Sequence, residues 1–113
     1  MNTLHKNLSA EQWDEAGFAA QMLNIGSEIS RAINWRDKNQ SQRVEDCIYR
    51  ALELLDMTIS GTSGFCRRRE LCRLRECIVD YFLYDNIYSA TDKQMRSYFD
   101  CFLYLARRPT GKS

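Results

Sequence analysis

The feature that most constrains this chain is a run of apolar residues between positions 44 and 59 that recur at intervals of three and four. An α-helix turns once in about 3.6 residues, so this spacing places them on one face of a helix. The set is Val44, Cys47, Ile48, Ala51, Leu52, Leu55 and Ile59. An amphipathic helix of this length is marginal alone in water and needs other helices against its apolar face.

Three further stretches have the same periodicity and supply those partners. They span roughly residues 10–36, 65–84 and 91–107, beside the second helix at roughly 41–59. Ser9 with Gln12, and Thr91 with Gln94, match the capping-box pattern of helix starts. Asn39 or Ser41 is expected to cap the second helix. The expected inward residues are Phe18, Met22, Ile25, Ile29, Ala32 and Ile33; Leu71, Leu74, Ile78, Tyr81 and Phe82; and Met95, Tyr98, Phe99, Phe102, Leu103 and Ala106.

Short polar links separate these helices, at residues 37–41, 60–64 and 85–90. Short links make consecutive helices antiparallel. The sequence therefore predicts an all-α, single-domain protein over residues 1–113, an up-down-up-down antiparallel four-helix bundle. Small residues on a second flank of the first helix, among them Ala19, Ala20 and Gly26, are expected to let another helix approach closely.

Composition narrows the class of protein. About 44% of the residues are hydrophobic and 27% are charged, which is typical of a globular chain. No apolar run approaches the roughly 20 residues of a membrane helix, and the N-terminus lacks the apolar stretch of a signal peptide. We therefore expect a cytoplasmic protein without membrane contact. The five cysteines are odd in number and form no C-x-x-C pair, so we expect reduced thiols on or beside apolar helix faces.

Residues that could carry catalysis or bind metal are scarce. His5 is the only histidine, so the glutamate–histidine motifs of di-iron bundles are absent. Glu53 with Asp56, and Glu76 with Asp80, are interpreted as solvated carboxylates rather than metal ligands. We expect no catalytic residue, no metal and no cofactor, and an enzyme is the less favoured class.

An arginine cluster is the most unusual feature: Arg67, Arg68, Arg69, Arg73 and Arg75. The first three stand at the start of a helix, where the dipole disfavours cations. Three interpretations stay open. The cluster is a solvated face partly neutralised by Glu70, Glu76 and Asp80, a surface for a protein partner, or a site for phosphates and bases.

Several apolar residues fall outside the inward faces. Tyr49, Met57, Cys72, Val79 and Tyr104 could form a second apolar surface, and Tyr84 and Tyr88 are not inward either. Tyrosine and methionine are frequent in protein interfaces. The leading hypothesis is thus a non-catalytic helical-bundle interaction module that self-associates or docks to a protein partner. The alternative is an accessory RNA- or DNA-binding protein that uses the arginines at 67–75.

Overall fold

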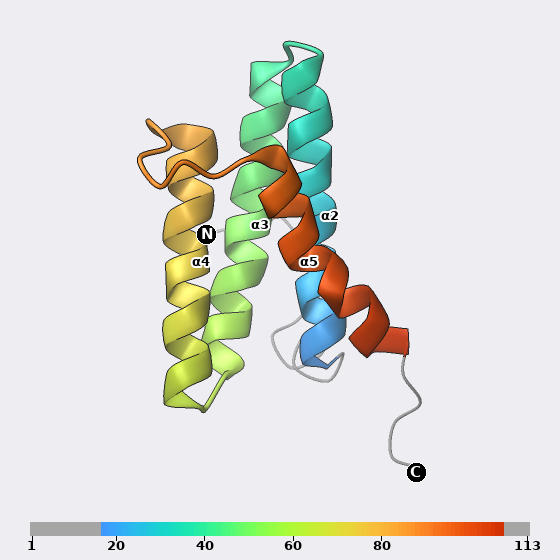
Figure 1. Cartoon of the computed structure of the whole chain (residues 1–113), viewed down its shortest axis with the longest axis vertical. Helices are drawn as coiled ribbons and strands as arrows, with labels where there is room; N and C mark the ends of the chain where they lie inside the picture. Colours follow the sequence, from blue (N-terminus) through green and yellow to red (C-terminus); the bar gives the residue numbers. More distant parts are fainter. Residues whose placement is uncertain (1–16, 108–113) are drawn as a thin grey trace.

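A computed structural model describes residues 17–107 of the chain, with side chains as far as Leu103 (Figure 1). Its secondary structure over this range is four helices: α2 (Phe18–Asp37), α3 (Ser41–Gly61), α4 (Phe65–Leu83) and α5 (Asp92–Arg107). The all-α prediction is confirmed. The expected start of the first helix, with its Ser9–Gln12 cap, lies outside the described residues.

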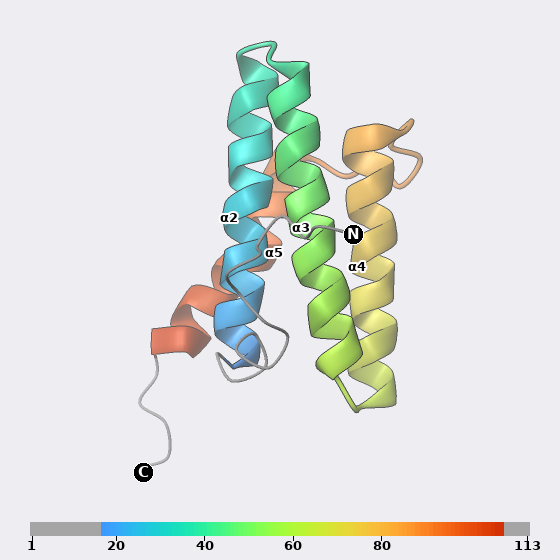
Figure 2. The ribbon, with the colours of Figure 1, turned by 180° about the vertical axis from the view of Figure 1, so that it is seen from behind.

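Consecutive helices run in opposite directions, which confirms the up-down-up-down topology (Figures 1 and 2). The central pair is α2 and α3; α4 packs against α3, and α5 packs against α2. The Cα atoms of α4 and α5 do not come within 8 Å of each other, although these helices are neighbours in sequence. One side of the bundle is therefore open between α4 and α5.

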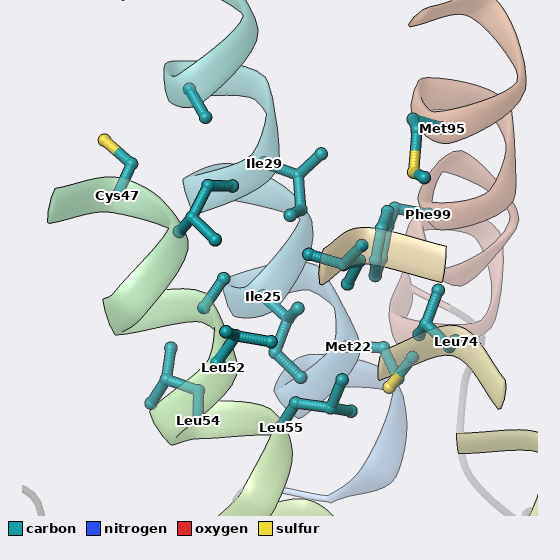
Figure 3. Packing of buried hydrophobic residues seen from close by; sticks show 14 of the residues in the cluster. Met22, Ile25, Ile29, Cys47, Leu52, Leu54, Leu55, Leu74, Met95 and Phe99 are labelled. Carbon is teal, nitrogen blue, oxygen red and sulfur yellow. The ribbon is translucent and has the colours of Figure 1, made fainter. Parts of the chain in front are cut away.

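The core lies between these helices, and it contains the apolar face predicted for the second helix. Its residues from α2, α3, α4 and α5 form one cluster (Figure 3). Ile59 is only partly buried, and Leu54 is buried although the periodicity did not select it. The buried apolar residues are Met22, Ile25, Ile29, Ala32, Ile33, Val44, Cys47, Ile48, Ala51, Leu52, Leu54, Leu55, Leu71, Leu74, Ile78, Met95, Phe99 and Phe102.

The position of α5 depends on Gly26 in α2. A Cβ atom at Gly26 would lie 2.7 Å from Cβ and 2.8 Å from Cγ of Phe99. The missing side chain therefore lets the Phe99 ring rest on the α2 backbone. The expectation that small residues on this flank admit another helix is confirmed at Gly26.

The helix ends agree only in part with the sequence signals. Thr91 and Gln94 form the predicted capping box: the Thr91 N–H donates to the Gln94 side chain at 3.0 Å, and the Gln94 N–H donates to the Thr91 hydroxyl at 3.1 Å. The predicted cap of α3 is wrong, because Gln40 occupies that position without a side-chain bond. Asn39 instead adopts a φ of 59° just beyond α2, a left-handed conformation that asparagine tolerates.

One predicted inward position is wrong, because Leu103 is 41% exposed. Tyr81, Phe82 and Tyr98 are only partly buried, but they pack against the core as predicted. Three of the five cysteines, Cys66, Cys72 and Cys101, are exposed rather than set in apolar faces; none of the five forms a disulfide. Tyr98 lines the open side between α4 and α5, which explains its partial exposure.

Candidate interaction surface

The link from α4 to α5 is a closely bonded loop rather than a plain connection. Its anchor is Asp80, a residue in the last turn of α4 that is only 8% exposed. The Asp80 carboxylate accepts the backbone N–H of Ile87 at 2.9 Å and that of Tyr88 at 3.1 Å. Its backbone carbonyl accepts the N–H of Asn86 at 3.0 Å. The interpretation of Asp80 as a solvated carboxylate is therefore wrong, because the loop folds back over it.

Asn86 closes the second half of the loop. Its side-chain N–H donates to the Ala90 carbonyl, and its side-chain oxygen accepts the Ala90 N–H, both at 2.9 Å. Asn86 and Ser89 have φ values of 53° and 56°. A left-handed conformation is uncommon for residues other than glycine, and here side-chain and backbone hydrogen bonds hold it. The loop consequently has one defined shape.

This shape turns three large apolar side chains outward: Tyr84 is 74% exposed, Ile87 76% and Tyr88 56%. We call these three residues the aromatic loop. It projects beside the C-terminal end of α4, away from the rest of the bundle (Figures 1 and 2). Burying one such side chain is worth about 1.5–3 kcal/mol, so their common exposure makes the loop a candidate contact surface.

A hollow of about 460 Å³ lies next to the aromatic loop. Val79 lines it together with Arg75, Glu76 and the loop residues. Arg75 forms a two-pronged pair with Asp56 of α3, at 2.8 and 3.3 Å, and this hydrogen bonding raises the pKa of the Arg75 guanidinium. The lining of the hollow thus combines apolar side chains with charged ones, namely Val79, Tyr84, Ile87 and Tyr88 with Arg75, Glu76, Asp80 and Asp85.

The residues predicted for an apolar surface have different surroundings. Tyr49 and Cys72 are exposed, whereas Met57 and Val79 are partly buried and pack against the core. Val79 lies beside the aromatic loop; the side chain of Tyr104 lies outside the described residues. Ile87 was missed, although a lone apolar residue between asparagine and tyrosine in a polar link could have signalled it.

The structure separates the five arginines of the cluster. Arg75 is paired with Asp56, and Arg67 lies 4.1 Å from the centre of the Phe18 ring, a cation–π contact. Arg68, Arg69 and Arg73 are exposed and form no ion pair within 4 Å with any residue in the described range. Phe65 beside them is 76% exposed.

The open side between α4 and α5 holds a shallow groove of about 240 Å³. Glu70, Leu74 and Cys77 of α4 face Met95 and Tyr98 of α5 across it. Burial raises the pKa of Cys77, and burial together with the charge of Glu70 raises that of Tyr98. Both groups therefore stay protonated at neutral pH, and the groove offers no activated nucleophile.

Polar contacts also link the helices elsewhere. Arg36 at the end of α2 donates to Asp92 of α5 at 2.5 Å, and the Tyr81 hydroxyl donates to the same carboxylate. Glu28, buried in α2, accepts from Arg50 of α3 at 3.3 Å. Arg50 also donates to the buried Cys47, whose pKa burial raises. These contacts join elements of the fold.

Within the described residues, no three histidine, cysteine or acidic side chains gather in a group that could hold a metal ion. None of the described helices is both long and apolar enough to cross a membrane. The chain matches no protein-family model, no curated protein and no solved structure.

Proposed function

We propose that this chain is a helical interaction module that self-associates through the aromatic loop and the hollow beside it. The observation that carries the proposal is the pair of hydrogen bonds from Ile87 and Tyr88 to the buried Asp80 carboxylate. They fix the loop backbone while its apolar side chains face water. A surface that is ordered before it binds loses less conformational entropy on association.

A second copy of the chain fits this surface because the projection and the hollow lie side by side. In a two-fold dimer the same patch meets itself, so a projection on each copy can enter the hollow of the other. Ile87 and Tyr88 supply the projection, and Val79 supplies part of the apolar lining of the hollow. Arg75, Glu76 and Asp85 give the rim both signs of charge, which suits a patch that must face its own copy.

The chemistry of the surface favours contact over catalysis. Asp80 is committed to the loop backbone and Arg75 to Asp56, so these polar groups already have partners. Besides the rim charges of Glu76 and Asp85, the outward area is aromatic and aliphatic, and buried aromatic side chains are frequent among interface hot spots.

Sedimentation equilibrium over a wide concentration range tests the proposal. We expect a reversible dimer for the wild-type chain. The double variant Ile87→Ser/Tyr88→Ser should weaken it at least tenfold while leaving both backbone N–H groups on Asp80. Leu103→Ser, which removes an exposed apolar side chain from α5, is the matched control and should dimerise like the wild type. A wild-type chain that stays monomeric, or equal weakening in both variants, would overturn the proposal.

A further inference from the structure

We propose that the exposed side of α4 at its N-terminal half binds single-stranded nucleic acid, with arginines on the phosphates and Phe65 stacked on a base. Phe65, Arg68, Arg69 and Arg73 are spaced by three, four and eight residues, which places them on neighbouring parts of one helix surface. All four are exposed. We call them the α4 basic strip; it lies at the opposite end of α4 from the aromatic loop.

The start of the strip keeps its charge because the carboxylates of Asp56 and Asp80 are already hydrogen-bonded elsewhere. Asp56 pairs with Arg75, and Asp80 accepts from the loop backbone. Glu70, the one acidic residue between positions 65 and 75, lines the groove toward α5 together with Arg73 and can offset the charge of that arginine. Asp80 forms no ion pair with the arginines of the described range. Arg68 and Arg69 are left as a local positive charge on a chain whose net charge is only +1.

This arrangement costs stability within the isolated chain. The first turn of α4 carries no acidic residue, and its N-cap residue Gly64 makes no side-chain capping bond. Cations there oppose the helix dipole by about 0.3–1 kcal/mol each. A polyanion held by the same arginines would offset that repulsion.

The residue types point to nucleic acid among polyanions. Every cation of the cluster is arginine, whose planar guanidinium binds phosphate in a two-pronged manner and stacks on bases. Phe65 adds a ring that is 76% exposed, and stacking of a base on such an aromatic ring is worth about 1–3 kcal/mol. Only unpaired bases offer a free face, so the ring selects single strands. A membrane surface would need a broader apolar face than this one ring supplies.

Fluorescence anisotropy with short labelled oligouridine and oligothymidine tests the inference, and the two oligomers separate RNA from DNA as the source. We expect wild-type binding that weakens as salt rises. The triple variant Arg68→Gln/Arg69→Gln/Arg73→Gln should bind at least tenfold more weakly. Each lost phosphate contact lowers the salt slope by about 0.7, so the slope should fall by about 2. Phe65→Ala should weaken binding about five- to a hundredfold with the salt slope unchanged.

The control is a second triple variant with the same change of net charge, Arg31→Gln/Arg43→Gln/Arg96→Gln, on α2, α3 and α5. It should bind as the wild type does, and circular dichroism melts should show every variant folded. Equal losses in the two triple variants would reduce the effect to bulk charge and overturn the inference. So would an absence of oligonucleotide binding, a preference for duplex of the same sequence, or binding to phosphatidylserine vesicles alone.

Discussion

Asp80 and Ile87 are joined across seven residues by a 2.9 Å hydrogen bond, from the exposed residue's backbone to the buried residue's carboxylate. In most loops an exposed side chain goes with a loosely held backbone, but in this loop the bond holds the backbone while the side chain stays exposed. The Ile87 backbone is fixed to the end of α4, whereas its side chain is open to solvent. The outward side chains can therefore be changed without dissolving the loop, and the loop can be loosened without touching them.

Replacing Asp80 with alanine should lower the free energy of unfolding by about 1–3 kcal/mol, because two N–H groups lose their acceptor. Urea denaturation measures this cost. Hydrogen exchange should show faster exchange at the amides of Ile87 and Tyr88. Glu76→Ala, an exposed carboxylate on the same helix, is the control and should change stability by less than about 0.5 kcal/mol. Equal effects at both positions would mean that the Asp80 bonds add nothing to the loop.

Gly26→Ala should destabilise the chain by about 1–3 kcal/mol, although alanine is the better helix former. The added methyl would lie under 3 Å from Phe99, so α5 must shift away from α2. Thermal unfolding detects the loss, and exposed Ser27→Ala on the same helix controls for propensity. In a Phe99→Gly background, which removes the Cβ as well as the ring, the Gly26 substitution should cost much less. A similar cost in both backgrounds would show that the clash is not with the Phe99 side chain.

Leu55→Ala should cost more than Leu74→Ala, with both inside the roughly 2–5 kcal/mol expected of buried leucines. Leu55 is fully buried, so its truncation leaves a closed cavity. Leu74 lines the groove between α4 and α5, where the lost volume opens to solvent and neighbours can relax. Chemical denaturation of the two variants side by side gives the order. The reverse order would mean that the groove closes in solution.

Cysteine alkylation should divide the thiols into two groups. The exposed Cys66, Cys72 and Cys101 should react first, and the buried Cys47 last. Burial raises the pKa of Cys47 and Cys77, so their reaction should also need a higher pH. A thiol pKa raised by folding favours the folded state below the unfolded pKa, and this contribution is lost as pH rises through the folded value. The free energy of unfolding should accordingly fall above about pH 8.5. Peptide mass spectrometry of a timed alkylation at several pH values measures the order in which the cysteines react.

The helices and their topology follow from local patterns, so the sequence alone could predict them. The α3 face and the Thr91–Gln94 cap each depend on residues within a few turns of one another. The gap between α4 and α5 does not depend on such local patterns, because the approach of Phe99 to Gly26 joins residues 73 positions apart. The burial of Asp80 could not be predicted from the sequence pattern either, because a charged residue at this position is expected to face solvent unless a loop covers it. Tyr84 and Tyr88 were recognised as outward residues, but nothing local showed that Asp80 orders them.

In the spatial order α4, α3, α2, α5, the α2–α3 pair is the centre of the bundle, and α4 and α5 are its outer helices. Each outer helix rests on one inner helix, and their backbones do not meet. Opening of an outer helix therefore breaks its backbone packing on one inner helix and a few side-chain contacts such as that of Tyr81 with Asp92. We expect α4 and α5 to unfold locally at lower free energy than the α2–α3 hairpin. Slow-exchanging amides should accordingly concentrate in α2 and α3. The aromatic loop and the α4 basic strip both involve α4. A ligand that binds to α4 should therefore slow hydrogen exchange in α4 and leave the exchange rates of α2 and α3 unchanged.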